Sequence, residues 1–315
     1  MNIPYAIINT DLDGFLSGLL LHHFLGTEIV GFCDSGEYVW KKEGVAWEDC
    51  TFIDMFVVPK DIPTLCNHMI AVDTEHAEDL FRNGDKMNPN VDVAIRSFKE
   101  SYTTKFSLAT VHYIIAKLEQ FNHPLIEKIT LRNTSQGYRC IDVLLRADDV
   151  LNNTVHTYRE NSLFWWDRMQ TIASTRDQGL FTKSLLNYAN AIHKGDIRKD
   201  IGRYNRLFGN FAKNRFNCDT PDGGYRGLNF GDTHIKKHSK AFVSFLSELF
   251  GLEPFPMDDE LVVYKGEAHR TNLSTEDLDD IRHGEFRDQK LFSYAFVCRP
   301  SSENHFSYTV NLERL

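Results

Sequence analysis

The first 25 residues constrain the fold of this chain more than any other stretch. The apolar segment 5–8 is followed by Asp11 and Asp13, then by Gly14, and then by the apolar run 15–25. This order is typical of a buried strand, a tight turn and the start of a helix. Open α/β sheets bind ligands at the carboxyl ends of their strands. We therefore predict that the two aspartates lie at such an edge.

The following residues extend the same pattern into an α/β fold. Gly26 is a helix stop signal, and residues 28–33 read as the next strand. A strand, a helix and a strand in succession predict parallel pairing. The fold class predicted for the N-terminal part is therefore α/β, with a mainly parallel sheet flanked by helices.

Two more apolar runs carry an aspartate at or near their ends. Asp54 belongs to the run 50–56, and Asp73 follows the run 68–72. Residues 91–95 are a candidate for a further strand. Because parallel strands end at the same edge of a sheet, we expect the four aspartates to converge.

Converging carboxylates have two interpretations. Hard cations such as Mg²⁺ and Mn²⁺ prefer carboxylate oxygens, so the cluster predicts a metal site. Aspartate is also favoured in turns and at helix N-caps for reasons unrelated to metals. Asp11 and Asp13 alone fit both interpretations, whereas three acidic strand ends in one array favour the metal site.

The turn also carries a longer motif. The residues Asp11-Leu12-Asp13-Gly14-Phe15-Leu16-Ser17 after an apolar strand resemble the first motif, DxDGxxS, of the DHH phosphoesterase superfamily. The resemblance implies a phosphodiester hydrolase with Mn²⁺ or Mg²⁺ ions, in which Asp11 and Asp13 bind different ions and Asp54 bridges them. It also implies a fourth acidic motif, for which Asp148 or Asp149 is the best match.

The third motif departs from the family pattern. Where the family has Asp-His-His, this chain has Asp73-Thr74-Glu75-His76. Glu75 or His76 could supply a replacement ligand, so one or two ions are expected. The predicted catalytic residues are Asp11, Asp13, Asp54, Asp73 and His76, and the predicted metal ligands are the same five together with Glu75, Asp148 and Asp149.

The resemblance covers about residues 4–150, and it predicts three parts of the chain. These are a metal-binding phosphoesterase domain at 1–150, a helical connecting region at 151–216 and a smaller α+β substrate domain at 217–315. Residues 217–231 are rich in Gly, Asp and Asn and predict either an interdomain linker or a substrate loop. The glycine-rich GGGH segment of many relatives is absent from the sequence.

Two stretches near the C-terminus, residues 291–298 and 305–312, alternate in polarity around a turn signal. This pattern predicts a β-hairpin.

Charge limits the partners. The net charge is −9, which disfavours binding to long duplex DNA, since such binding depends on a basic surface. A small phosphate substrate, an oligonucleotide or a nucleotide, could still be held by metals and a few cations. The candidate substrate-binding residues are Arg198, Arg203, Lys236 and Lys237.

Other features of the sequence bear on the compartment. The six cysteines form no CxxC motif and are expected to be reduced thiols. No apolar run of about 18 residues and no basic N-terminal signal region occur, so we expect no membrane span and a cytoplasmic location. The oligomeric state, including a homodimer, is left open.

Three functional hypotheses remain at this stage. The first is a metal-dependent phosphoesterase that hydrolyses short oligonucleotides or cyclic nucleotides with a metal-activated water, which includes nuclease activity. The second is a catalytically impaired protein on the same fold that binds or sequesters nucleotides, because the third motif is altered. The third is that the strand-end acids are structural.

Overall fold

The computed structural model describes residues 1–34, 36–82, 85–129, 140–177, 179–194, 198–220, 223–257 and 260–315. Its fold is α/β, as predicted. The chain divides into two compact units, each assembled from separate stretches. Unit 1 comprises residues 1–4, 10–29 and 107–257, and unit 2 comprises residues 5–9, 30–106 and 258–315. The predicted boundaries at 150 and 216 therefore do not coincide with the units.

The strands of the described residues form one mixed sheet of ten, which belongs to unit 2 apart from the first two residues of β2. Its order is β6-β5-β4-β1-β2-β3-β7-β10-β9-β8. The pairs β1 with β4, β4 with β5 and β5 with β6 are parallel. The pairs β2 with β3, β3 with β7, β7 with β10, β10 with β9 and β9 with β8 are antiparallel. The strands are β1 Tyr5–Asn9, β2 Glu28–Cys33, β3 Tyr38–Lys41, β4 Cys50–Ile53, β5 Thr64–Leu65, β6 Lys86–Met87, β7 Val262–Thr271, β8 Glu285–Phe286, β9 Gln289–Phe296 and β10 Phe306–Arg314.

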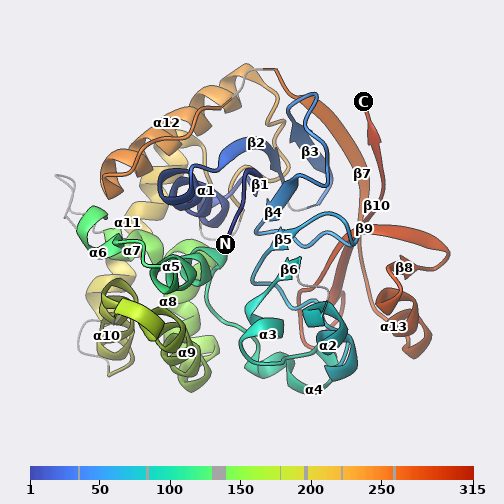
Figure 1. The fold of residues 1–315 in the computed structure, drawn as a ribbon, viewed down its shortest axis with the longest axis horizontal. Coiled ribbons are helices and arrows are strands. Elements are labelled where there is room, and N and C mark those ends of the chain that lie inside the picture. Colours follow the sequence, from blue (N-terminus) through green and yellow to red (C-terminus); the bar gives the residue numbers. More distant parts are fainter. Residues whose placement is uncertain are drawn as a thin grey trace. The chain divides into compact units, whose positions relative to one another are not determined.

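The C-terminal strands extend the N-terminal sheet instead of forming a sheet of their own. β7 pairs with β3, with Tyr38 opposite Lys265 and Lys41 opposite Val262. Figure 1 shows the blue and red strands in this one sheet. The predicted hairpin is confirmed, since β9 and β10 pair antiparallel. The separate C-terminal substrate domain is not seen, because its strands complete the sheet of unit 2.

Two predicted strands are wrong. Residues 68–72 form a buried irregular segment, whose carbonyl groups bond to β9: Met69 O accepts from Phe296 N, and Ile70 O accepts from the Tyr294 hydroxyl. These bonds satisfy an apolar backbone without a strand ladder. Residues 91 and 92 belong instead to the short helix Pro89–Asp92, which forms because Asn88 caps it and a proline occupies its first turn.

The helices of unit 2 are short. They are α2 Thr74–Arg82, α3 Pro89–Asp92, α4 Phe98–Ser101 and α13 Thr275–Arg282. The aromatic rings of β9 and β10 pack with Phe98 of α4 and Phe56, and Phe98 stacks on Phe296 at 4.3 Å.

Unit 1 is helical. Its helices are α1 Leu12–Leu25, α5 Thr110–Gln120, α6 Leu125–Lys128, α7 Cys140–Leu144, α8 Val150–Asn152, α9 Arg159–Asp177, α10 Leu180–Lys194, α11 Arg198–Phe216 and α12 Thr233–Phe250. Helix α1 is buried from Leu12 to Leu21. The helix is apolar on more than one face because α5 and α12 both pack against it. Phe15 meets Tyr225 and Phe242 edge to face, at 5.9 and 6.0 Å.

Among the described residues, no helix combines the length and the apolar character that a membrane span requires.

Candidate metal site

Asp11 begins helix α1. Its carboxylate accepts the backbone N–H of Gly14 at 2.9 Å, and its backbone is extended. These are the properties of an N-cap residue, which satisfies one of the free donors in the first helical turn. A role as the N-cap of α1 is therefore sufficient to explain the position of Asp11.

Asp13 is fully buried and is held by another helix. Its Oδ2 atom accepts the N–H of Thr110 at 2.7 Å, and its Oδ1 atom accepts the N–H of Val111 at 2.8 Å and faces the Ser17 hydroxyl at 3.4 Å. Thr110 and Val111 are the first residues of α5. The positive end of that helix thus stabilises a buried carboxylate and fixes its orientation.

Asp148 lies next to Asp13 within unit 1. One carboxylate oxygen of each residue lies within 4.8 Å of the other. Two oxygens that share one divalent ion, at roughly 2.0–2.6 Å each, lie at most about 4–5 Å apart. The pair therefore fits the first two ligands of a single hard cation.

The turn that carries Asp148 and Asp149 is left-handed at both residues, with φ of 48° and 50°. This conformation costs of order 1–3 kcal/mol each for residues other than glycine, and it persists only where the surroundings impose it. Asp149 pairs with Arg146 at 3.4 Å, and Arg146 also donates to the carbonyl of Thr220 at 2.6 Å. Of the two predicted candidates, Asp148 is the one next to Asp13.

The glycine-rich segment packs directly on the turn before α1. Tyr225 N donates to Thr10 O at 2.8 Å, and Gly224 adopts φ +52° against the backbone of Thr10 and Asp11. A Cβ at Gly224 would lie 2.2 Å from Thr10 O and 2.4 Å from Asp11 Cα. Both flanking helices, α11 and α12, belong to unit 1, so this segment is a loop at the candidate site and not a linker between units. Pro221 and Asp222 of the predicted turn lie outside the described residues.

The same loop holds a buried thiol close to the turn. Burial raises the pKa of Cys218 well above its usual range, and the neighbouring charge of Asp11 adds to the effect. At pH 7 this cysteine is therefore a neutral thiol.

Asp54 belongs to unit 2 and directly follows β4. It is 1% exposed, has φ 63° and accepts the side-chain N–H of Asn9 at 3.1 Å. Asn9 ends β1, which pairs in parallel with β4. The expectation that Asp54 follows a strand of the parallel part of the sheet is therefore confirmed.

Asp73 and His76 have other partners, whereas Glu75 faces solvent. Asp73 accepts the N–H of His76 at 3.1 Å, and its other oxygen pairs with Arg282 and with Lys99, the latter at 3.7 Å. Glu75 is exposed at the start of α2. Among the described residues, none of the three belongs to a group of three or more potential ligand atoms close enough to share an ion. We therefore leave them out of the candidate metal site.

The direction of α11 and α12 decides whether the predicted basic residues meet. Phe216 packs on Phe242 at 5.1 Å, and Phe211 packs on Phe245 at 5.2 Å. The two helices are therefore antiparallel, with the end of α11 beside the middle of α12.

This arrangement separates the basic residues along the helices. At 1.5 Å per residue, Arg203 lies about 20 Å before Phe216, and Lys237 lies about 7 Å beyond Phe242 in the opposite direction. Arg203 and Lys237 are exposed, Lys236 is half-buried, and the side chain of Arg198 lies outside the described residues. These residues do not form one substrate-binding cluster.

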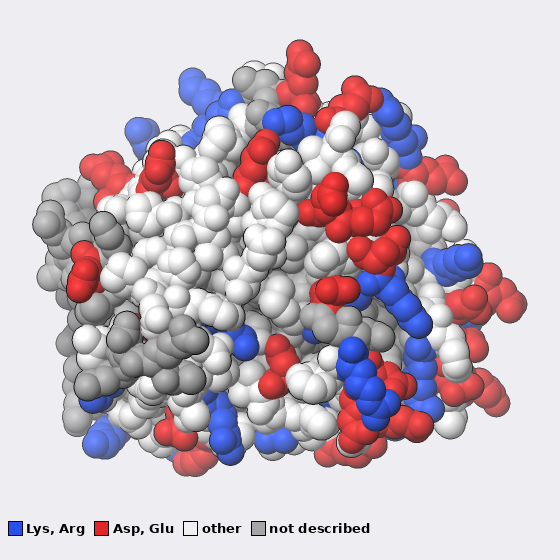
Figure 2. Space-filling model, in the orientation of Figure 1, with Lys and Arg blue, Asp and Glu red and all other residues white. Residues whose placement is uncertain are grey.

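Charged side chains of both signs are mixed on the surface. Over unit 2, on the right of Figure 2, Lys and Arg side chains lie beside Asp and Glu side chains and form no continuous basic area on the face shown. A long phosphate backbone needs such an area. The face shown has no such area.

Sequence reasoning did not find the groups that orient Asp13. The backbone N–H groups of Thr110 and Val111 belong to a helix that begins 97 positions later than Asp13. Arg146, which links the Asp148 turn to the glycine-rich loop, was equally missed. Its only sequence signal is its place three residues before Asp149.

Comparisons with known proteins add no assignment. No protein-family model, no curated protein and no solved structure matches this chain.

Proposed function

We propose that this protein is a metal-dependent phosphoesterase that hydrolyses small phosphodiesters. The observation that carries the proposal is the buried Asp13 carboxylate, held by the start of α5 with an oxygen of Asp148 within 4.8 Å. Asp13 is fully buried and Asp148 is half-buried, and such a pair of carboxylates is unfavourable unless a cation compensates their charges. The oxygen-only donor set suits Mn²⁺ or Mg²⁺ better than a thiolate-preferring ion.

Asp54 is the third proposed ligand. Its support is the chain order: β4 pairs with β1, Asp54 bonds to the last residue of β1, and Asp13 follows that residue by four positions. Four residues of chain span at most about 14 Å, which restricts how far Asp13 can be from Asn9.

The roles of the chain's residues follow from their environments. Asp13 is oriented by two backbone donors, so it meets an ion without a rearrangement of its side chain. Asp148 is placed by its left-handed turn, and Arg146 ties that turn to the glycine-rich loop. An ion bound by these carboxylates supplies a water of lowered pKa and charge stabilisation for the phosphoryl oxygens.

The test is hydrolysis of bis(p-nitrophenyl) phosphate and of a short oligonucleotide with added Mn²⁺. We expect turnover by the wild type and a loss of more than about 100-fold in Asp13→Asn and Asp54→Asn, since even loss of a group that only orients a ligand costs roughly 10–100-fold. Asp167→Asn, which changes an exposed acid of α9, is the matched control and should keep full activity.

The sequestering hypothesis makes a different prediction for the same samples. Tight Mn²⁺-dependent nucleotide binding without turnover would favour it over the enzyme. Turnover that persists in both Asp variants would refute the proposed site.

A further inference from the structure

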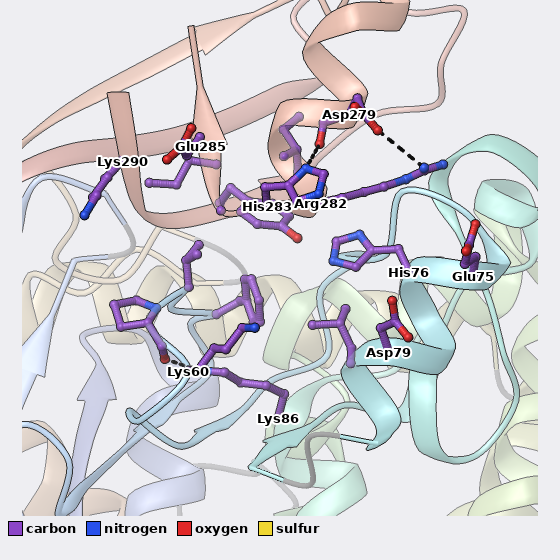
Figure 3. Close-up of a pocket in the computed structure, with 18 of the residues that line it drawn as sticks. Lys60, Glu75, His76, Asp79, Lys86, Asp279, Arg282, His283, Glu285 and Lys290 are labelled. Carbon is purple, nitrogen blue, oxygen red and sulfur yellow. Dashed lines mark hydrogen bonds and ion pairs between the residues drawn. The ribbon is translucent and has the colours of Figure 1, made fainter. Parts of the chain in front are cut away.

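Unit 2 contains a pocket of about 830 Å³ that none of the assignments above uses. It lies between α2, the segment after β4 and the end of α13 (Figure 3). Its apolar wall includes Phe56, Leu80, Ile281 and Tyr294, each at most 8% exposed. Its volume is that of pockets that bind small organic ligands.

Two histidines line the pocket, and the backbone fixes their tautomers. His76 Nδ1 accepts the N–H of Val72 at 3.3 Å, so the proton of the neutral ring is on Nε2. His283 Nδ1 lies 2.9 Å from Asp279 O, and a carbonyl only accepts, so His283 carries its proton on Nδ1 and has a lone pair on Nε2. The pocket thus has one imidazole donor and one imidazole acceptor.

The two rings line the same pocket, and the charge of His283 is, after burial, one of the effects that lower the pKa of His76. Figure 3 shows His76 on α2 and His283 just after α13 on neighbouring walls of the pocket. Burial lowers the pKa of His76 to about 4, so this ring is neutral at pH 7. The pair can therefore meet a ligand edge that has an acceptor beside a donor.

Most cations of the pocket have protein partners. Arg82 binds Glu78 and Asp79, and Arg282 binds Asp73. The Lys86 ammonium donates to three backbone carbonyls of the segment after β4.

Lys60 and Lys290 differ from those cations. Both are exposed, line the pocket and form no ion pair with any described residue. They are available to a phosphate. The exposed acids Glu75 and Glu285 also line the pocket and can accept hydrogen bonds from sugar hydroxyls.

We propose that this pocket binds a nucleoside monophosphate whose base has a lactam edge, a ring N–H beside a carbonyl, as in uracil and guanine. The base carbonyl accepts from His76 Nε2–H, and the ring N–H donates to His283 Nε2. The base packs on the apolar wall, and the phosphate meets Lys60 and Lys290. This site depends on no metal ligand of the proposed function.

The test is calorimetric titration of the full chain in EDTA with UMP, GMP, CMP, AMP, uridine and inorganic phosphate. UMP and GMP should bind at least about tenfold more tightly than CMP and AMP, because the latter leave the buried His76 donor unpaired. Uridine and inorganic phosphate should each bind at least about tenfold more weakly than UMP.

Two variants at exposed residues test recognition of the base and of the phosphate separately. His283→Ala should show a smaller preference for UMP over CMP than the wild type, because it removes the acceptor of the ring N–H and keeps the His76 donor, and the double variant Lys60→Ala with Lys290→Ala should bind UMP no better than uridine. Arg270→Ala, an exposed cation of β7 outside the pocket, is the control and should match the wild type.

Several outcomes would overturn the proposal. These are no binding of UMP or GMP to the wild type, equal binding of all four nucleotides, binding of inorganic phosphate as tight as that of UMP, or unchanged selectivity in His283→Ala. Because EDTA removes divalent ions, such a failure would leave the proposed phosphoesterase site untouched.

Discussion

Replacement of Gly224 by alanine should destabilise unit 1 through one close backbone contact. The new Cβ would lie 2.2 Å from Thr10 O and 2.5 Å from Asp11 Cβ, and neither neighbour is the end of a flexible side chain. The loop or the turn before α1 must then shift. Inserting a methyl group into a packed region typically costs 1–3 kcal/mol.

The left-handed backbone of Gly224 adds a separate cost to the substitution. The substitution Gly227→Ala measures that cost alone. Gly227 has φ +73°, and a Cβ built there meets nothing within 4 Å. Gly227→Ala should therefore cost only the left-handed conformation, roughly 1 kcal/mol after the lower entropy of the unfolded chain is counted. Gly224→Ala should cost this amount and the contact together, about 2–4 kcal/mol.

Urea unfolding of both variants measures the two free energies of unfolding, with equal m values as the condition for comparing them. The difference between the variants isolates the contact between the loop and the turn. Equal destabilisation of Gly224→Ala and Gly227→Ala would refute the reasoning, because the two sites differ in that contact. Mn²⁺-dependent hydrolysis should fall in Gly224→Ala and not in Gly227→Ala, since only the first displaces the turn that leads directly into Asp13.

Two further predictions concern buried basic side chains of unit 2. The pKa of His76 is lowered from 6.5 to about 4, so below pH 6.5 the unfolded chain takes up a proton that the native state does not. The free energy of unfolding should therefore fall by about 3 kcal/mol between pH 6.5 and 4. Urea unfolding at several pH values should show a smaller fall in His76→Gln than in the wild type. Lys86→Met should cost about 2–4 kcal/mol in thermal or urea unfolding, since it leaves two buried carbonyls and one half-buried carbonyl without their donor. Lys265→Met, at an exposed position of β7, should show no comparable loss.

Local patterns predicted the N-terminal elements well. Residues 28–33 form β2 as expected, and α1 begins after Asp11 and ends at Gly26. Each of these features depends on neighbouring residues only, namely an apolar run, a capping carboxylate and a glycine in the left-handed conformation.

Features that depend on distant residues were not predictable in the same way. The pairing of β3 with β7 joins residues more than 200 positions apart, and no local pattern specifies it. The run 68–72 has the composition of a strand, but its carbonyls are satisfied by β9 from the side. Asp73 was predicted to be a metal ligand because it was expected to follow a strand of the parallel sheet. Residues 68–72 do not form that strand, so the basis of this prediction is absent.

Asp13 has two possible roles, capping of α5 and binding of the metal ion. The dependence of the free energy of unfolding on Mn²⁺ distinguishes them. Asn has one oxygen where Asp has two, so Asp13→Asn loses the N–H bond of either Thr110 or Val111 and should cost about 1–3 kcal/mol in EDTA. If Asp13 only caps α5, Mn²⁺ will not change this cost. If Asp13 also binds the ion, the wild type gains about 2.7 kcal/mol at a Mn²⁺ concentration of 100 times Kd, and the variant gains much less. The difference between wild type and variant should then widen to about 4–6 kcal/mol, and a difference that stays constant as Mn²⁺ is added would mean that the buried carboxylate has a structural role alone.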